Sequence, residues 1–165
     1  MRRMSLLATL APLVYVQVSP DRVTLRNVKS GQSVSEPPLL AINRQLKAPI
    51  LAVGAEAATR AGPGVQMVNP FAHPRTLVSD FVHGEQLLKA LLRRLLPNAI
   101  FTVSPRVVLH AMGDPEGGFT QIEVRALHEM ALGAGAAEVR LWQGRALSDE
   151  ELLSGTFPAD GKLLA

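Results

Sequence analysis

The chain has 165 residues, of which 47% are hydrophobic and 19% are charged, so it can bury a core and is not of the disordered class. Its net charge is +3, and no run of Lys and Arg is interleaved with aromatic residues, so we expect no nucleic-acid partner. Cysteine is absent, which excludes disulfides, thiolate catalysis and zinc sites built on cysteine.

The N-terminal segment, residues 1–12, combines two arginines with an apolar run. A signal peptide has this pattern, but here the run continues directly into an alternating strand. The run is also shorter than the roughly 18 residues of a membrane-spanning helix. Two interpretations stay open for it: a frayed terminus, or an amphipathic segment that contacts a membrane surface weakly. The contact would be made by Arg2, Arg3, Met4, Leu6 and Leu7.

Residues 14–42 predict an antiparallel meander of three strands. Residues 14–19 alternate between apolar and polar, and Pro20-Asp21 is typical of a turn. Val23 and Leu25 continue a second strand. A third strand is expected over 33–42, irregular or at a sheet edge where it contains two consecutive prolines.

Residues 49–53 predict a short apolar strand, and residues 54–60 one or two helical turns. Residues 65–81 are expected to be irregular. A strong helix follows over 84–96, because leucines repeat along it at the spacing of a broad buried stripe. The stripe consists of Leu87, Leu88, Leu91, Leu92, Leu95 and Leu96.

The C-terminal third predicts a strand over 106–110, a helix over 120–134, a strand over 138–142 and a short helix that begins near Ser148. The residues expected to face inward from the second helix are Ile122, Ala126, Leu127, Met130, Ala131 and Ala134. The tail after Gly155 shows little pattern. The order predicts an α/β fold with a mixed five-stranded sheet, a three-strand meander plus parallel strands, flanked by helices.

Five stretches, in order and with similar spacing, resemble one family. SEPPLLAI (35–42) is similar to NEPSVVAI, ILAVGAEA (50–57) to VLAVGEEA, and LVSDF (77–81) to VIADF. SPRVV (104–108) resembles the entry to the next strand. TQIEVRALHEMALGAGAAEV (120–139) is similar to T-x-V-E-R-R-A-I-R-E-S-A-x-x-A-G-A-R-E-V. The family is MreB, the bacterial actin-like shape-determining proteins, and the resemblance runs from Val14 to Trp142.

This resemblance implies an actin-like, RNase H-like first domain over 13–155, with a small inserted subdomain over about 36–80 and a tail at 156–165. Members of the family bind ATP between two large domains and polymerise beneath the membrane. The second phosphate loop and the adenosine pocket belong to a second domain, and nothing after Gly155 resembles it.

The family's first phosphate-binding hairpin carries D-L-G-T. Counted back from Glu36 without gaps, these positions are Gln17, Val18, Ser19 and Pro20. Gln17 has no charge for Mg²⁺, Ser19 has a Cβ where a glycine allows close approach, and Pro20 has no N–H for a phosphate. The resemblance therefore implies a plain hairpin with degenerate phosphate chemistry.

The family's water-orienting Glu, in E-E-P, is also replaced. Gln143 and Gly144 stand in its place, and neither can act as a general base. We therefore expect a pseudo-ATPase with no catalytic residues, no metal and no ATP cofactor. Its expected role is accessory to, or modulating, the cell-shape cytoskeleton, through contact with a full-length MreB-like protein or with itself. The expected location is cytoplasmic, with the inner face of the cell membrane as the alternative.

Two other interpretations stay open at this point. One is a reduced ATPase that uses Asp21, Asp114 or Glu116, since the loop 113–118 follows a strand end where α/β sheets often bind ligands. His110, near those carboxylates in sequence, is either part of such a site or a polar residue that ends a strand. The other interpretation is an adaptor that acts at a membrane surface through residues 1–11.

Overall fold

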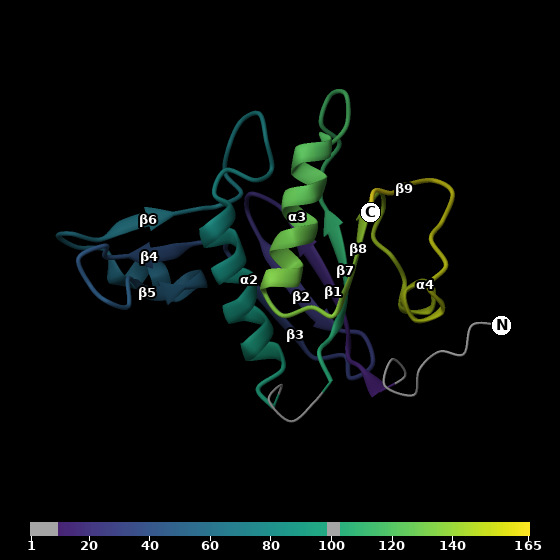
Figure 1. The fold of residues 1–165 in the computed structure, drawn as a ribbon, viewed down its shortest axis with the longest axis horizontal. Coiled ribbons are helices and arrows are strands. Elements are labelled where there is room, and N and C mark those ends of the chain that lie inside the picture. The colour runs from purple at the N-terminus through teal and green to yellow at the C-terminus, as the bar shows by residue number, and fades with distance from the viewer. Residues whose placement is uncertain (1–9, 99–102) are drawn as a thin grey trace.

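The computed structural model describes residues 10–98 and 103–165. Its strands are β1 (Leu13–Val18), β2 (Val23–Asn27), β3 (Ser33–Glu36), β4 (Leu40–Ile42), β5 (Ile50–Val53), β6 (Gln66–Val68), β7 (Arg106–Ala111), β8 (Glu138–Gln143) and β9 (Lys162–Leu163). Its helices are the 3₁₀ helix η1 (Gly54–Arg60) and the α-helices α2 (Phe81–Leu95), α3 (Gln121–Gly133) and α4 (Asp149–Ser154) (Figure 1). The predictions for Arg2, Arg3, Met4, Leu6 and Leu7 lie outside the described residues.

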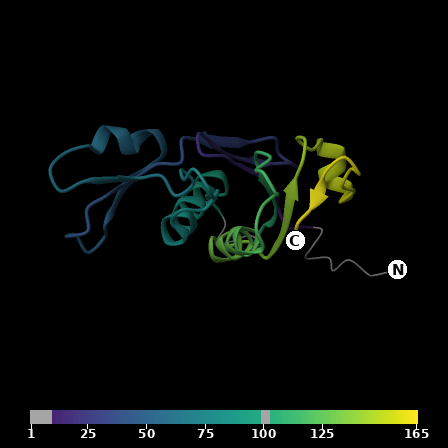
Figure 2. The same cartoon turned by 90° about the horizontal axis from the view of Figure 1, so that it is seen from above.

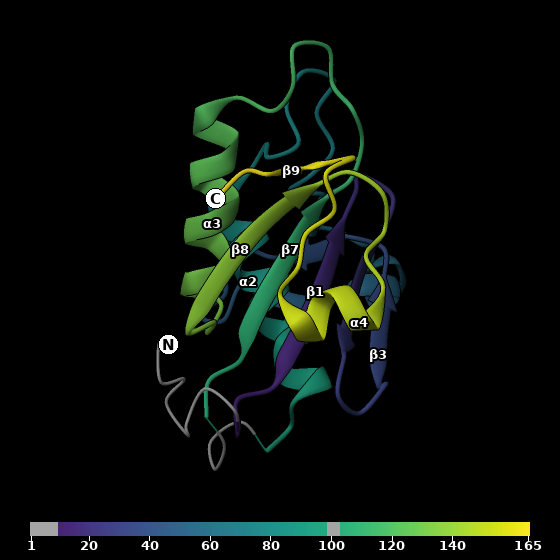
Figure 3. The same ribbon diagram turned by 90° about the vertical axis from the view of Figure 1, so that its right-hand side faces the viewer.

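The main sheet has the strand order β3-β2-β1-β7-β8-β9. Strands β1, β7 and β8 are parallel, and the pairs β1–β2, β2–β3 and β8–β9 are antiparallel. The predicted fold class, a mixed sheet flanked by helices, is confirmed (Figure 3). The expected five strands are joined by a sixth, β9, formed by the tail in which the sequence shows little pattern.

A second, smaller sheet has the order β5-β4-β6 and is antiparallel throughout. It projects away from the main sheet (Figures 1 and 2). The prediction of one strand over 33–42 is wrong, because β3 ends at Glu36 in the main sheet and β4 begins at Leu40 in the small one. The break falls at Pro37-Pro38, where two missing N–H groups prevent a continuous ladder.

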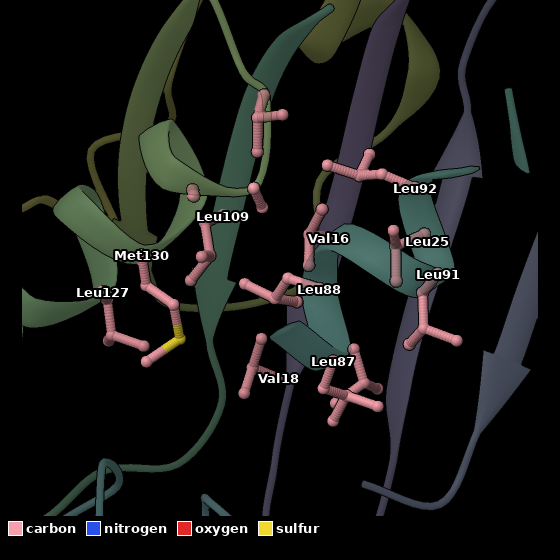
Figure 4. Packing of buried hydrophobic residues seen from close by; sticks show 14 of the residues in the cluster. Val16, Val18, Leu25, Leu87, Leu88, Leu91, Leu92, Leu109, Leu127 and Met130 are labelled. Carbon is pink, nitrogen blue, oxygen red and sulfur yellow. The ribbon is translucent and has the colours of Figure 1, made fainter. Parts of the chain in front are cut away.

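The two faces of the main sheet bury different clusters. One face contributes Val16 and Leu109 to the large core, where they pack with leucines of α2 and with Met130 of α3 (Figure 4). Leu141 of β8 belongs to the same cluster. The opposite face carries Tyr15 and other side chains, and a second cluster forms there with residues from α4 and the segment before it. Burial on both faces explains why β7, RVVLHA, reads as a nearly continuous apolar run.

The long helices begin at side-chain caps. Asp80 accepts a hydrogen bond from the His83 backbone N–H, so α2 begins at Phe81, three residues before the predicted start. The predicted leucine stripe is confirmed, since five of its six leucines are buried and Leu96 is partly buried. No helix among the described residues has both the length and the apolar character needed to cross a membrane.

Helix α3 begins after a capping box at Thr120 and Glu123. The expectation that Ile122 faces inward is wrong, because its side chain is 82% exposed. The buried stripe instead starts at Glu123 and continues through Leu127 and Met130, and Ile122 lies about 100° around the helix from that stripe.

Candidate functional site: a polar cleft at the strand ends

The carboxyl ends of β7 and β8 border a cleft of about 910 Å³, in the position where open α/β sheets bind ligands. It is lined by the loop 113–118, by Gln143 and Gly144, and by the tail residues 159–162. The structure thus brings together four of the residues singled out from the sequence. They are Asp114, Glu116, Gln143 and Gly144.

Gln143 faces the glycine-rich loop from the end of β8. Its Nε2 lies 3.5 Å from Asp114 Oδ1 and 3.5 Å from the Gly113 carbonyl oxygen, both acceptors for the amide protons. An amide at this position donates to the loop and cannot remove a proton from a water molecule. Gly144 beside it has φ of +153°, and a Cβ there would come within 2.7 Å of the Trp142 ring.

The β1–β2 hairpin ends in a turn that hydrogen-bonds within itself. The Ser19 N–H donates to the Arg22 carbonyl oxygen at 3.0 Å, and the Arg22 N–H donates to Ser19 Oγ at 3.1 Å. Pro20 has no N–H, and its carbonyl oxygen accepts from Asn69 Nδ2 at 2.9 Å. Every described residue with positive φ is a glycine, so this turn lacks the left-handed residue that forms an anion nest.

The hairpin residues Gln17, Val18, Ser19, Pro20 and Asp21 are not among those that line the cleft. Gln17 lies near the carboxyl end of β1, an interior strand, with its Nε2 3.9 Å from the Met112 sulfur. Asp21 is exposed at the tip of the turn. Of the carboxylates considered from the sequence, only Asp114 and Glu116 reach the cleft.

His110 is not among the residues that line the cleft, and both of its ring nitrogens are used. Nε2 donates to the Gly144 carbonyl oxygen at 2.8 Å, since a carbonyl can only accept. Nδ1 therefore accepts from the Tyr15 hydroxyl at 2.6 Å, and that hydroxyl accepts from the Leu147 N–H. Burial lowers the pKa of His110 and raises that of Tyr15. His110 is thus a neutral bridge between strands, not a cleft residue.

A second set of residues, which was not identified from the sequence, anchors the tail beside the cleft. Arg145 donates to both carboxylate oxygens of Glu151, at 2.6 and 3.1 Å, and to Asp160 at 3.0 Å. The Arg145 hydrogen bonds lower the pKa of Glu151 to about 2. The start of a helix at Ser148 was recognisable from the sequence, but Asp160 is far from it in the chain. Among the described residues, no cluster of His, Asp and Glu could hold a metal ion.

The fold defines the class of protein. The crystal structure of MreB5 of Spiroplasma citri bound to ADP is similar, with a TM-score of 0.62 at 23% sequence identity, over 79% of this chain and 37% of that one. The same protein bound to AMPPNP is 25% identical with a TM-score of 0.61, over 79% of this chain and 38% of that one. The expected actin-like fold is therefore confirmed.

The sequence comparisons identify the family within that class. The family model described as MreB/Mbl protein matches residues 22–147, so the chain belongs to the MreB/Mbl family. It is 36% identical to the cell shape-determining protein MreB of Escherichia coli over 126 residues, which are 72% of this chain and 34% of that protein. It thus spans about a third of MreB. The Escherichia coli protein YjaA is 25% identical over 151 residues, and the match covers 86% of this chain and 94% of YjaA.

Proposed function

We propose that this chain is an MreB-family domain that neither binds nor hydrolyses ATP, and that acts in the cell-shape cytoskeleton by contact with other proteins. The observation that carries the first part is the hairpin turn. At the position of the family's first phosphate loop, the Ser19 and Arg22 amides bond within the turn, and Pro20 has no amide proton. Gln143, at the position of the water-orienting Glu, points its amide at Asp114.

Helix α3 supports the second part of the proposal. Its surface carries the exposed Ile122, and a groove of about 460 Å³ beside the helix is lined by Phe119, Val124 and Leu164 together with Gln121, Arg125 and His128. An exposed aliphatic side chain and a partly apolar groove on one helix are typical of protein-binding surfaces. The partner we propose is a full-length MreB-like protein or a second copy of this chain, and the chain acts as an accessory or modulator of that assembly.

A reduced ATPase is the second candidate function. The observation that favours it is the cleft itself, whose 910 Å³ is within the range of small-molecule sites and which holds the Asp114 and Glu116 carboxylates. A fold neighbour, MreB5, is described as bound to ADP and to AMPPNP. Here, however, the cleft is lined by carboxylates without an arginine and with a single lysine, Lys162, which is an unfavourable setting for a polyphosphate.

Titration of the purified chain with a fluorescent ATP analogue and Mg²⁺ distinguishes the two candidates. We expect no saturable binding in the micromolar range. A full-length MreB measured in parallel is the positive control and should bind the analogue. Micromolar binding that is weakened by Asp114→Asn and not by Asp21→Asn would contradict the proposal and favour the reduced ATPase.

Co-sedimentation with filaments of a full-length MreB-like protein tests the contact through α3. We expect the chain to pellet with the filaments, and we expect Ile122→Asp to remain in the supernatant because a charge enters the apolar surface. Leu153→Asp is the matched control, since Leu153 is 54% exposed on α4. If the unaltered chain neither pellets with the filaments nor self-associates in analytical ultracentrifugation, the proposed protein contact is wrong.

A further inference from the structure

We propose that the outer end of the small sheet is a binding surface for anionic lipid headgroups. We call this surface the insert tip and define it as the loop 43–49 together with residues 60–67. The proposal does not depend on whether the chain binds ATP, and it concerns a different part of the molecule from the N-terminal segment.

The insert tip is the end of the small sheet that points away from the main sheet. Leu40 pairs with Val53 and Val68 at the inner end, where the Val53 carbonyl oxygen accepts a hydrogen bond from Arg94 of α2. At the other end Ile42 pairs with residues of β5 and β6, and the loop 43–49 begins there. Figures 1 and 2 show this end projecting into solvent.

Positive charge is concentrated in this part of the chain. The insert tip contains three cations, Arg44, Lys47 and Arg60, and no carboxylate, so its net charge is +3. Their positive potential favours an anionic partner.

Most of this charge is not neutralised within the chain. Glu56 pairs with Arg60 at 3.1 Å, while Arg44 Nε donates to the neutral amide of Gln66 at 3.3 Å. Within residues 10–98 and 103–165, neither Arg44 nor Lys47 forms an ion pair. Burial raises the pKa of Asp80, but the contacts with His83 and, to a smaller extent, the charge of Arg44 outweigh burial and lower it, so Asp80 is mainly the partner of His83.

Exposed apolar side chains lie among these cations. Leu46 is 49% exposed between Arg44 and Lys47 in the loop, and Met67 is 38% exposed on β6. The loop conformation is defined by Asn43, whose side chain accepts from the Gln45 N–H and whose carbonyl oxygen accepts from the Leu46 N–H. Leu46 is thus held half-exposed in a basic loop.

The composition of the insert tip favours a lipid surface over a protein partner. A stable protein interface is a broad patch of about 800 Å² on each side with an apolar centre, whereas the insert tip presents one half-exposed leucine, Leu46, between two cations on a projecting loop. A bilayer interface needs much less, because one aliphatic side chain enters the headgroup layer while adjacent cations bind lipid phosphates. We therefore assign anionic lipid, rather than an acidic protein, as the partner.

A single-cysteine label tests insertion directly, because the chain has no native cysteine. Leu46→Cys, labelled with an environment-sensitive dye, should show a blue shift with vesicles of phosphatidylglycerol and phosphatidylcholine, and none with phosphatidylcholine alone. Leu153→Cys is the matched control, since its side chain is similarly exposed on a different element. The control should not respond, even if the N-terminal segment holds the chain at the vesicle.

Charge variants test the electrostatic part in the full chain. Each cation near an anionic surface contributes about fivefold to partitioning, or about 1 kcal/mol, so Arg44→Gln with Lys47→Gln should lower the partition coefficient by about 25-fold. Lys89→Gln with Arg93→Gln makes the same charge change on α2 and should have little effect. No blue shift at residue 46, or equal effects of the two charge pairs, would overturn the proposal; an acidic protein would then be the partner to test.

Discussion

Glu123 holds the irregular segment before α2 against the start of α3. One carboxylate oxygen accepts from Thr76 Oγ1 at 2.9 Å and from the Leu77 N–H at 2.8 Å. The other accepts from the Thr120 N–H and hydroxyl, at 2.8 and 3.0 Å. Burial raises the pKa of Glu123, but these four hydrogen bonds outweigh it, so the net pKa is lowered and the group is ionised.

Glu123→Gln should destabilise the fold by about 1–3 kcal/mol, because an NH₂ group would face donors that need an acceptor. Urea unfolding at neutral pH measures this change. Glu129→Gln, on the exposed face of the same helix, is the control and should be close to neutral. Equal stability of the two variants would mean that the Glu123 hydrogen bonds contribute nothing net.

His110 should make stability depend on pH. Its pKa is lowered in the folded state by burial, so the unfolded chain binds a proton first as the pH falls below the ordinary value of 6.5. The contribution is fully present above that pH and is lost as the pH falls toward the folded-state pKa. The expected slope of the unfolding free energy approaches about 1.4 kcal/mol per pH unit.

Urea unfolding from about pH 7.5 down to about pH 5 measures that slope. The carboxylates Asp80, Glu123 and Glu151 have lowered pKa values and lose their contributions only in more acid solution. His110→Phe should reduce the slope, whereas His128→Gln should leave it unchanged. An unchanged slope in His110→Phe would assign the dependence to another group.

For single residues, the sequence predicts the element in which a residue lies better than it predicts what the side chain contacts. It predicts a strand over 106–110, which β7 exceeds by one residue, and it places Asp114 and Glu116 in a loop at the strand end, as the structure has them. It does not reveal that His110 bonds to Tyr15, because the two residues are 95 positions apart. Nor does it reveal that Glu123 is buried, since the donors that compensate its charge come from a separate segment.

Helices α2 and α3 approach each other closely at a glycine. A Cβ added to Gly84 would lie 2.6 Å from Met130 Cε and 2.8 Å from its sulfur. On the other side of the contact, a Cβ at Gly133 would lie 2.1 Å from the Glu85 carboxylate. Small residues at both positions therefore set the separation of the two helices.

Gly84→Val should destabilise the protein by about 1–3 kcal/mol, because two methyl groups enter an occupied space. Gly84→Ala should be close to neutral, since the flexible end of Met130 can move and alanine favours the helix by about 1 kcal/mol over glycine. In a Met130→Ala background the cost of Gly84→Val should shrink, as a double-mutant cycle by thermal unfolding would show. If Gly84→Val destabilises the protein equally with and without Met130, the clash is not with the Met130 side chain.

Elements with strong periodicity were predictable, and those set by few residues were not. The leucine stripe of α2 repeats over about two and a half turns, from Leu87 to Leu95, so its existence and buried face follow from the sequence. The division of 33–42 between two sheets depends on which strand each half meets, which no local pattern encodes. Pro37-Pro38 marks an irregularity but does not reveal that β4 pairs with β5 and β6.

The C-terminal tail forms one edge of the main sheet, next to β8. Strand β9 pairs with the end of β8, the Leu141 N–H donates to the Ala165 carbonyl oxygen at 2.8 Å, and the Leu164 N–H donates back to Leu141 at 2.7 Å. Two paired residues are too few to give a periodic signal, so the sixth strand could not be predicted. The tail also supplies Asp160 and Lys162 to the cleft wall.

Gly161→Ala should detach the tail from β8. Its Cβ would lie 2.4 Å from the Trp142 ring and 2.6 Å from the Gln143 carbonyl oxygen, neither of which can move without disturbing the sheet. Amide hydrogen exchange should become faster at Leu141 and Leu164, while β1 and β7 stay protected. Gly62→Ala, with nothing within 4 Å of the added Cβ, is the control. Unchanged exchange in Gly161→Ala would show that the tail adapts in place.

The position of Trp142 gives this protein an internal optical sensor. It is the single tryptophan of the chain, its side chain is 0% exposed, and its indole N–H donates to the Arg145 carbonyl oxygen. Phe157 of the tail lies 5.5 Å from its ring, and Gly161 lies directly against it. Because no second indole contributes, the wavelength of intrinsic emission reports whether the tail covers the ring. Any ligand, lipid or protein that displaces the tail should therefore shift the tryptophan emission of the unlabelled protein.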